Sequence, residues 1–464
     1  MLFSSPIFFA FFAVYFLLHI FIPLRYRTLL IIVGSTVFYA SWRLEYVVLP
    51  YLLMAVAFFG TAWMVQAESQ SSRRSRLIFT IVLLFAPLFF FKYTDFIFRD
   101  VLGPLLGNSK NILGWPLPLG ISFVTFTMTA YVVDIYHRAF TQRSSFKTVL
   151  AYVLFFPHLI AGPILRPHEL IPQLERPRPA FQIHARAAIL IFTIGLVKKL
   201  IFADQIAAIV DAVYSGGSHD AAQSLLAIYG FSVQIYCDFS GYTDMAIGVA
   251  MLIGVRLPNN FMRPYAATSL IEFWRRWHIT LSHWLRDYLY IPLGGNRGGL
   301  WSLVRNIMIT MVLGGLWHGA NWTFVIWGAL HGAGLSFIHA IRRISGGLRA
   351  VRMSKLIGLV LTFNFVTLAW VFFRAPNFRT AGNMLAAPFV QPWPGFSQFF
   401  SHNFFYVGLI LLFFCLHPFD DHRRFRAMAR YARLEIFWPF VVLLWVLAIS
   451  LSQMSSAKFI YFDF

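Results

Sequence analysis

Long apolar runs recur along the whole chain and are separated by short polar segments. Each run approaches the ~20 residues that a helix needs to cross the hydrocarbon core of a bilayer. A spanning segment must satisfy its own backbone hydrogen bonds, so helices are expected. The pattern predicts an all-α polytopic membrane protein with about 11 or 12 transmembrane helices. The expected spans cover residues 7–22, 28–42, 47–65, 77–94, 117–136, 187–209, 224–253, 301–316, 320–340, 356–374, 404–418 and 436–453.

The loops between these runs alternate in basic content, which predicts the orientation of the chain. Lys and Arg gather in the loops at 25–27, 73–76 and 138–147, whereas the loops at 43–46 and 95–115 carry less net positive charge. Basic loops of membrane proteins stay in the cytoplasm. We therefore expect the N-terminus and the aromatic C-terminal tail to lie outside.

Three segments depart from the simple spanning pattern. Residues 148–163 are apolar but broken by two prolines and a glycine, with positive charge on both flanks, which predicts a re-entrant segment. Residues 256–300 are dense in Arg and Trp and are expected at the cytoplasmic face, partly as interfacial helix. Residues 375–403 read as a long loop of low charge on the outer face.

Composition agrees with a membrane protein. The chain is 59% hydrophobic and 12% charged, against about 25% charged residues in soluble domains. A net charge of +20 would suggest nucleic acid in a soluble protein. Here the basic residues lie in short loops beside apolar runs. We therefore expect them to contact anionic lipid, and we expect no nucleic-acid partner. The two cysteines, Cys237 and Cys415, lie in apolar runs and predict neither a disulfide framework nor a metal cluster.

Two polar clusters stand out, because polar groups at membrane depth are costly and mark lined cavities or paired structural roles. The first is FWRRWHITLSHWLRDYLYIPLGGNRGG, residues 273–299, and the second is GGLWHGANW, residues 314–322. In the second, His318 lies at a glycine-flanked break between two apolar runs. A neutral imidazole near its ordinary pKa of ~6.5 can take a proton from an attacking hydroxyl, which suits acyl transfer.

Several other chemistries are not supported. The chain has no HExxH, no Gly-x-Ser-x-Gly and no phosphate-binding Gly-rich loop ending in Lys-Ser/Thr, which argues against a zincin, a serine hydrolase and an ATP-driven pump. His278 and His283 are five residues apart and so do not share a helical face, and no metal site is expected. A polysaccharide exporter or transporter stays an alternative, although we find no inverted repeat that would favour it.

Five segments, in order along the chain, resemble the membrane-bound O-acyltransferase (MBOAT) family, specifically its bacterial branch that includes the alginate O-acetylation membrane subunit. They are residues 118–138, 155–167 and 236–248, the run RRWHITLSHWLRDYLYIPLGGNR and LGGLWHGANW. The resemblance implies an O-acyltransferase of the bacterial inner membrane, with helices arranged around a central tunnel. It implies one domain, residues 1–464, with N-terminal helices to 137, a catalytic core at 138–355 and C-terminal helices from 356.

By this resemblance, His318 matches the family's principal catalytic histidine, and His278 matches the histidine of its second motif, near the cytoplasmic donor side. No Ser or Cys nucleophile is supplied beside His318, so we expect direct attack on a thioester with His318 as general base. Trp317 and Asn321 are expected to orient His318 or to line the tunnel. The donor is expected to be acetyl-CoA or an acyl carrier protein, with no bound cofactor.

Two acidic residues, Asp238 and Asp244, lie in one apolar run and should face protein rather than lipid. Asp238 and Asp244 either form salt bridges that stabilise the fold or take part in substrate binding. The candidate partners for such bridges are Arg256, Arg275 and Arg276.

Other candidates lie nearer the two faces. Arg286, Asn296 and Arg297 are candidates for the donor's phosphates, or else form a solvated cytoplasmic face. In the tail FIYFDF, which resembles the aromatic C-terminus of the bacterial branch, Tyr461 is either an acyl relay or an interfacial anchor. The relay would serve an extracytoplasmic acetyltransferase and a polysaccharide such as alginate or a cell-wall glycan. D-alanyl transfer to teichoic acid from a carrier protein is the close alternative.

Overall fold

The computed structural model describes residues 1–107, 110–141, 144–178, 185–216, 219–344, 354–452 and 460. These residues form helices and connecting segments without a β-strand, which confirms the predicted fold class. The chain divides into two compact units. Met1–Phe192 and Tyr242–Pro258 make up the N-terminal unit, and Thr193–Gly241 and Asn259–Phe464 make up the C-terminal unit.

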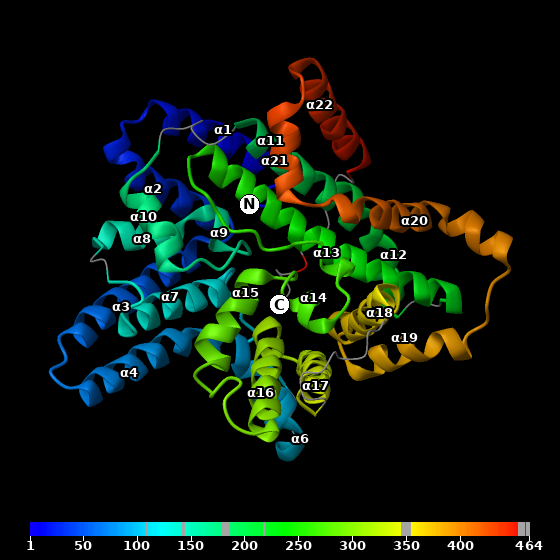
Figure 1. The fold of residues 1–464 in the computed structure, drawn as a ribbon, viewed down its shortest axis with the longest axis horizontal. Coiled ribbons are helices and arrows are strands. Elements are labelled where there is room, and N and C mark those ends of the chain that lie inside the picture. Colours follow the sequence, from blue (N-terminus) through cyan, green and yellow to red (C-terminus); the bar gives the residue numbers. More distant parts are fainter. Residues whose placement is uncertain are drawn as a thin grey trace. The chain divides into compact units, whose positions relative to one another are not determined.

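The N-terminal unit contains the first ten helices and the start of the eleventh. Their bounds are α1 (Pro6–Phe21), α2 (Arg27–Ala40), α3 (Val48–Val65), α4 (Gln70–Leu88), α5 (Thr94–Phe96), α6 (Gly103–Leu106), α7 (Ile121–Tyr136), α8 (Phe146–Leu154), α9 (Phe156–Leu159), α10 (Pro167–Glu175) and α11 (Ala185–Val197). Helices α3, α4 and α7 run side by side (Figure 1). The polar side chains of α7 do not break it, since the Thr129 hydroxyl donates to the Thr125 carbonyl oxygen one turn earlier.

The predicted re-entrant segment is a pair of short buried helices. Helix α8 has nine residues and α9 has four, and the chain leaves helical geometry at Phe155 between them. Nine residues span only about 14 Å, too little for a crossing. Residues 148–165 are buried throughout, as irregular backbone at this depth requires.

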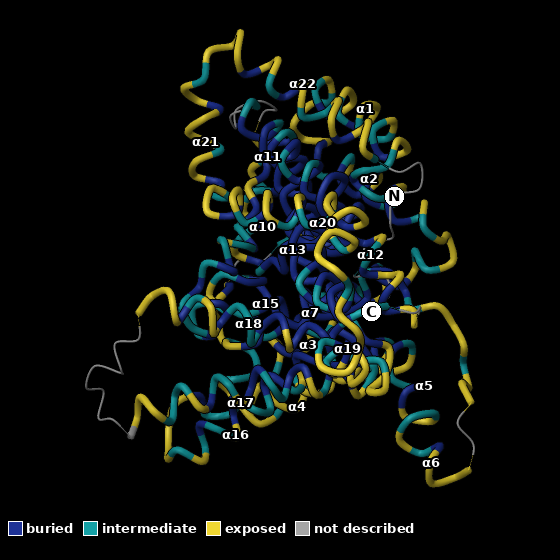
Figure 2. Tube along the Cα trace, turned by 90° about the vertical axis from the view of Figure 1, so that its right-hand side faces the viewer, coloured by how far each residue is buried: buried dark blue, intermediate teal, exposed yellow. Residues whose placement is uncertain are grey.

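The C-terminal unit contains the remaining helices. Their bounds are α12 (Asp204–Tyr214), α13 (Ala221–Leu252), α14 (Leu270–Trp274), α15 (Ile279–Leu285), α16 (Leu300–His318), α17 (Trp322–Ile344), α18 (Lys355–Arg374), α19 (Phe378–Val390), α20 (Phe396–Leu416), α21 (His422–Tyr431) and α22 (Leu434–Leu451). Helix α13 contributes its last residues, from Tyr242, to the N-terminal unit. It is buried along nearly its whole length (Figure 2).

Seven helical segments of the described residues are long and apolar enough to cross a membrane. They are Leu44–Val65, Gln70–Leu106, Leu300–His318, Trp322–Arg343, Lys355–Arg374, Phe396–Phe419 and Leu434–Leu451. Two further expected spans coincide with the shorter apolar helices Pro6–Phe21 and Ile121–Tyr136. The protein is therefore polytopic, while the count of 11 or 12 crossings stays a prediction.

The segment 375–403 is not the predicted loop, because it contains α19. The Asn377 side chain accepts a hydrogen bond from the Thr380 N–H at 2.9 Å and so caps the helix. The missed signal is this local cap, which the proline and phenylalanine content of the segment masked.

Helices α16 and α17 form a tightly packed antiparallel hairpin. A Cβ added at Gly315 would lie 2.2 Å from the Phe324 carbonyl oxygen, and one added at Gly328 would lie 2.3 Å from that of Met311. Only glycine permits this approach of the two backbones, a common device between membrane helices. The turn of this hairpin carries the WHGAN sequence.

The close approach of α16 and α17 predicts that substitution by alanine changes stability differently at two glycines. Gly315→Ala should destabilise the protein by about 1–3 kcal/mol, because its methyl group meets backbone rather than a movable side chain. Gly382→Ala is the control, since a Cβ at this exposed α19 position meets nothing within 4 Å. It should leave stability unchanged or slightly increased. Thermal unfolding in detergent measures both variants, and equal melting temperatures would contradict the packing.

Candidate active site

His318 is the last residue of α16 and lies in a cage of aromatic rings. Its ring centroid is 4.9 Å from that of Trp317, 5.2 Å from that of Trp327 and 5.2 Å from that of Phe373. The side chains come from α16, α17 and α18, so three spanning segments meet at this imidazole. Only 4% of His318 is exposed. The glycines of the hairpin make the cage possible, because they let α17 bring Trp327 this close.

His278 is completely buried and is the N-cap residue of α15, with a left-handed backbone conformation and φ of 40°. Its Nδ1 lies 3.2 Å from Asn260 Oδ1, which also accepts from the Thr280 N–H and hydroxyl. A backbone N–H can only donate, so the shared atom is an oxygen, and His278 Nδ1 must carry the proton. Its Nε2 therefore holds the lone pair. Burial lowers the pKa of His278 to about 3, which keeps the ring neutral.

The structure brings the two predicted histidines to one indole. The Trp317 ring centroid is 4.9 Å from that of His318 and 6.2 Å from that of His278. Segment 256–300, which was expected at the cytoplasmic face, is not wholly superficial, since Trp277 and His278 are buried.

A third buried histidine, His331 on α17, extends the same cluster and was missed from the sequence. Its ring lies 4.9 Å from Trp327, which also contacts His318. Its Nδ1 is 3.3 Å from the indole Nε1 of Trp274. An indole N–H is a donor only, so His331 Nδ1 accepts and its proton is on Nε2. The available signal was the sequence GALHGAG, another histidine flanked by glycines in an apolar run.

Comparison with known proteins identifies the family of the chain. Residues 35–378, which hold all three histidines, match the membrane-bound O-acyltransferase family. The chain therefore belongs to the MBOAT family. It is 40% identical to a probable alginate O-acetylase AlgI of Azotobacter vinelandii, over 84% of this chain and 78% of the relative. The family makes the protein an acyltransferase, and the exporter alternative is not supported.

The names of two other relatives give acceptors other than alginate. The MBOAT is 38% identical to a peptidoglycan O-acetyltransferase of Helicobacter pylori, over 83% of this chain and 79% of the relative. It is 27% identical to a teichoic acid D-alanyltransferase of Bacillus subtilis, over 56% of this chain and 69% of the relative. The similarity is therefore stronger to the O-acetylating relatives than to the D-alanylating one.

The MBOAT's predicted site residues near His318 differ in what they do. Trp317 contacts both histidines. Asn321 instead caps α17, because its Oδ1 accepts from the Thr323 N–H at 3.0 Å. Its Nδ2 donates to the Pro376 carbonyl oxygen at 2.9 Å and so ties the hairpin turn to the end of α18. Asn321 thus fixes the turn that carries His318.

Asp238 lies in a buried ion network of the C-terminal unit. Lys199 Nζ is 2.8 Å from Asp238 Oδ1 and 2.8 Å from Asp204 Oδ1, with each side chain at most 4% exposed. Asp238 Oδ2 also accepts from the Ile460 N–H at 2.7 Å. The salt bridge expected for Asp238 is present, but its partner is Lys199. For Asp238, the partners predicted from the sequence were therefore wrong, namely Arg256, Arg275 and Arg276.

The remaining predicted residues differ in burial and in partners. Asp244 is buried on α13 but belongs to the N-terminal unit. Arg286 is half-exposed and paired with Asp287 at 2.6 Å. Asn296 and Arg297 lie in an exposed loop between the π-helical turn Arg286–Tyr290 and α16. Tyr461 lies outside the described residues.

The ion network predicts a large difference between two charge-removing substitutions. Lys199→Met leaves two buried carboxylates without their shared cation and should cost about 3–5 kcal/mol. Arg286→Gln breaks a half-exposed pair and should cost no more than about 1 kcal/mol. Thermal unfolding of the purified variants measures both. Equal losses would show that the Lys199 network is not the stronger element.

Proposed function

We propose that this MBOAT moves an acetyl group from a cytoplasmic thioester across the bacterial inner membrane, for O-acetylation of an exopolysaccharide such as alginate or of a cell-wall glycan. The relatives at 38–40% identity, an alginate O-acetylase and a peptidoglycan O-acetyltransferase, support this acceptor class. D-alanyl transfer to teichoic acid is the second candidate. Its relative is 27% identical and covers 56% of this chain, which is weaker support.

The observation that carries the proposal is the pair of buried imidazoles around Trp317. His318 takes the proton from the acceptor hydroxyl, and the oxygen attacks the thioester carbonyl carbon. The tetrahedral intermediate collapses, the carbon–sulfur bond breaks, and the thiolate recovers the proton from the His318 imidazolium. The products are an ester and a free thiol. The rings of Trp317 and Trp327, about 5 Å away, favour the transient imidazolium through cation–π attraction.

His278 has a positioning role in this proposal. Its Nδ1–H is committed to Asn260, so its orientation is fixed, and its neutral ring packs against the indole that contacts His318. It thereby holds Trp317, and through it His318, in place. Its left-handed backbone is a conformation of the kind found at functional sites, where surrounding contacts hold it.

The donor is acetyl-CoA or an acylated carrier protein. Arg286, Asn296 and Arg297 are the proposed phosphate contacts, since they are exposed near the start of α16, the helix that ends at His318. A guanidinium binds phosphate through two parallel hydrogen bonds. Asn306 of α16 stabilises this loop, because its Nδ2 donates to the Gly295 carbonyl oxygen at 3.0 Å.

On the acceptor side, Tyr461 is the proposed first acceptor, which passes the acetyl group to an extracytoplasmic acetyltransferase. Its neighbour Ile460 donates its N–H to the buried Asp238. That bond supports a tail that reaches the interior of the C-terminal unit rather than one that only anchors at the interface.

His318→Ala tests the reaction. Polymer acetylation should fall by about 10²–10⁴-fold, the usual contribution of a general base, while polymer secretion stays normal. His339→Ala is the matched control, because this histidine also lies on α17 but outside the aromatic cluster, and it should keep full acetylation. Mass spectrometry of the surface glycan measures acetyl content. Normal acetylation in the His318 variant would refute the assignment.

Tyr461→Phe tests the relay separately, because it keeps the ring and removes only the phenol oxygen. Acetyl content of the polymer should fall to background, while Tyr431→Phe, which removes the same atom from an exposed position of α21, should change nothing. Undiminished acetylation in the Tyr461 variant would eliminate the relay and leave the role of His318 standing.

A further inference from the structure

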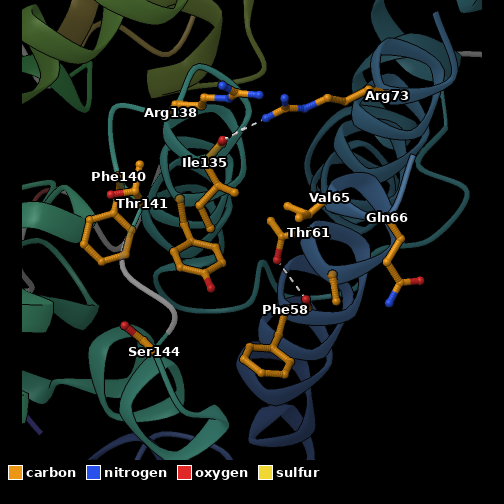
Figure 3. Close-up of a pocket in the computed structure, with 12 residues that line it drawn as sticks. Phe58, Thr61, Val65, Gln66, Arg73, Ile135, Arg138, Phe140, Thr141 and Ser144 are labelled. Carbon is orange, nitrogen blue, oxygen red and sulfur yellow. Dashed lines mark hydrogen bonds between the residues drawn. The ribbon is translucent and has the colours of Figure 1, made fainter. Parts of the chain in front are cut away.

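The N-terminal unit contains a cavity of about 570 Å³, whose lining residues lie between Phe58 and Ser144. It lies among α3, α4, α7 and the segment that follows α7 (Figure 3). Its volume is within the ~300–1,000 Å³ range of small-ligand sites. Apolar side chains form much of its wall, namely Phe58, Ala62, Val65, Ile135 and Phe140.

The cavity lies at one end of its helices. Helix α3 ends at Val65, α4 begins at Gln70 and α7 ends at Tyr136, so the three helix ends meet there. Arginines stack on aromatic rings at this level, with Arg76 4.9 Å from the Trp63 ring and Arg73 5.3 Å from the Tyr136 ring.

Such groups mark the headgroup region of a bilayer. The basic residues at 73–76, near the start of α4, and at 138–147 place this end of the helices in the cytoplasmic leaflet. The cavity therefore opens at the depth where lipid phosphates lie.

Two buried polar atoms in the cavity wall have no hydrogen-bond partner in the described part of the chain. They are Arg73 Nε and Ser144 Oγ. Arg73 donates through Nη2 to the Ile135 and Tyr136 carbonyl oxygens, at 3.3 and 2.9 Å, which fixes its guanidinium at the cavity edge. A buried donor without a partner is costly, and an anion at this edge would remove the cost.

Arg138 supplies a second guanidinium in an unusual backbone state. It follows the C-cap of α7 with φ of 59°, at a position where helices ordinarily carry glycine. The turn is held by the Ala139 N–H, which donates to the Asp134 carbonyl oxygen at 2.8 Å. Figure 3 shows the Arg73 and Arg138 side chains along the same edge of the cavity. A strained arginine where glycine would fit better is a sign of function.

We propose that this cavity binds one anionic phospholipid of the cytoplasmic leaflet. The phosphate lies between Arg73 and Arg138, and the first part of an acyl chain lies along Phe58, Val65 and Phe140. Free phosphate would leave the apolar wall without a partner. The location among membrane helices at headgroup depth favours a lipid over an acidic protein.

The test is native mass spectrometry of the full-length protein in detergent, titrated with dioleoylphosphatidylglycerol. Wild type should bind one molecule with higher affinity than it binds dioleoylphosphatidylcholine. Arg138→Gly should weaken that binding by about fivefold, the usual effect of one arginine on an anionic lipid. The same variant should melt no earlier than wild type, because glycine relieves the left-handed strain. This separates loss of a ligand contact from misfolding.

Arg74→Gln is the control, since it removes an equal charge from the next residue of α4, which is exposed and does not line the cavity. It should keep wild-type affinity. Four results would overturn the proposal. They are equal binding of both lipids, an equal loss in the Arg74 variant, saturation by inorganic phosphate alone with the same affinity, and a loss of acidic carrier-protein binding in Arg138→Gly while lipid binding is kept.

Discussion

Contact between buried imidazole rings and tryptophan is the interaction on which the C-terminal unit depends. His278, His318 and His331 are linked through Trp317 and Trp327, with ring centroids 4.9–6.2 Å apart. Burial lowers the pKa of His278, so this ring is neutral. The cluster exists only because the glycines of the α16–α17 hairpin let two backbones approach without side chains between them.

Features encoded locally were predictable from the sequence, and features that depend on contacts between distant segments were not. Apolar runs of sufficient length gave the all-α polytopic fold, and the glycine-flanked break gave the hairpin that ends in His318. The depth of His278 was missed because it depends on Asn260 and Trp317, whose proximity no spacing reveals. His331 was missed because its partner Trp274 is 57 residues away. The helix within 375–403 was missed because its asparagine cap was overlooked.

Two groups of charged side chains differ in how completely they are paired. Lys199, Asp204 and Asp238 are buried and form ion pairs with one another, and Asp238 also accepts from the Ile460 N–H, so this network ties Ile460 to α13. The sequence identified Asp238 as a buried group in need of a cation, but the nearest arginines in sequence were not its partners. Arg73 and Arg138 instead lie at helix ends, where one is only partly satisfied and the other is held in a strained backbone. The first group stabilises the fold, and the second is available to a ligand.

The claim that His318 is the general base for attack of a hydroxyl on a thioester is tested most directly by thiol release from acetyl-CoA by the purified protein in proteoliposomes with the acceptor hydroxyl present. The account predicts that His318→Ala loses thiol release while acetyl-CoA binding, followed by calorimetry, is unchanged, because the imidazole acts on the acceptor hydroxyl and not on the donor. A variant that still releases thiol at the wild-type rate would contradict it.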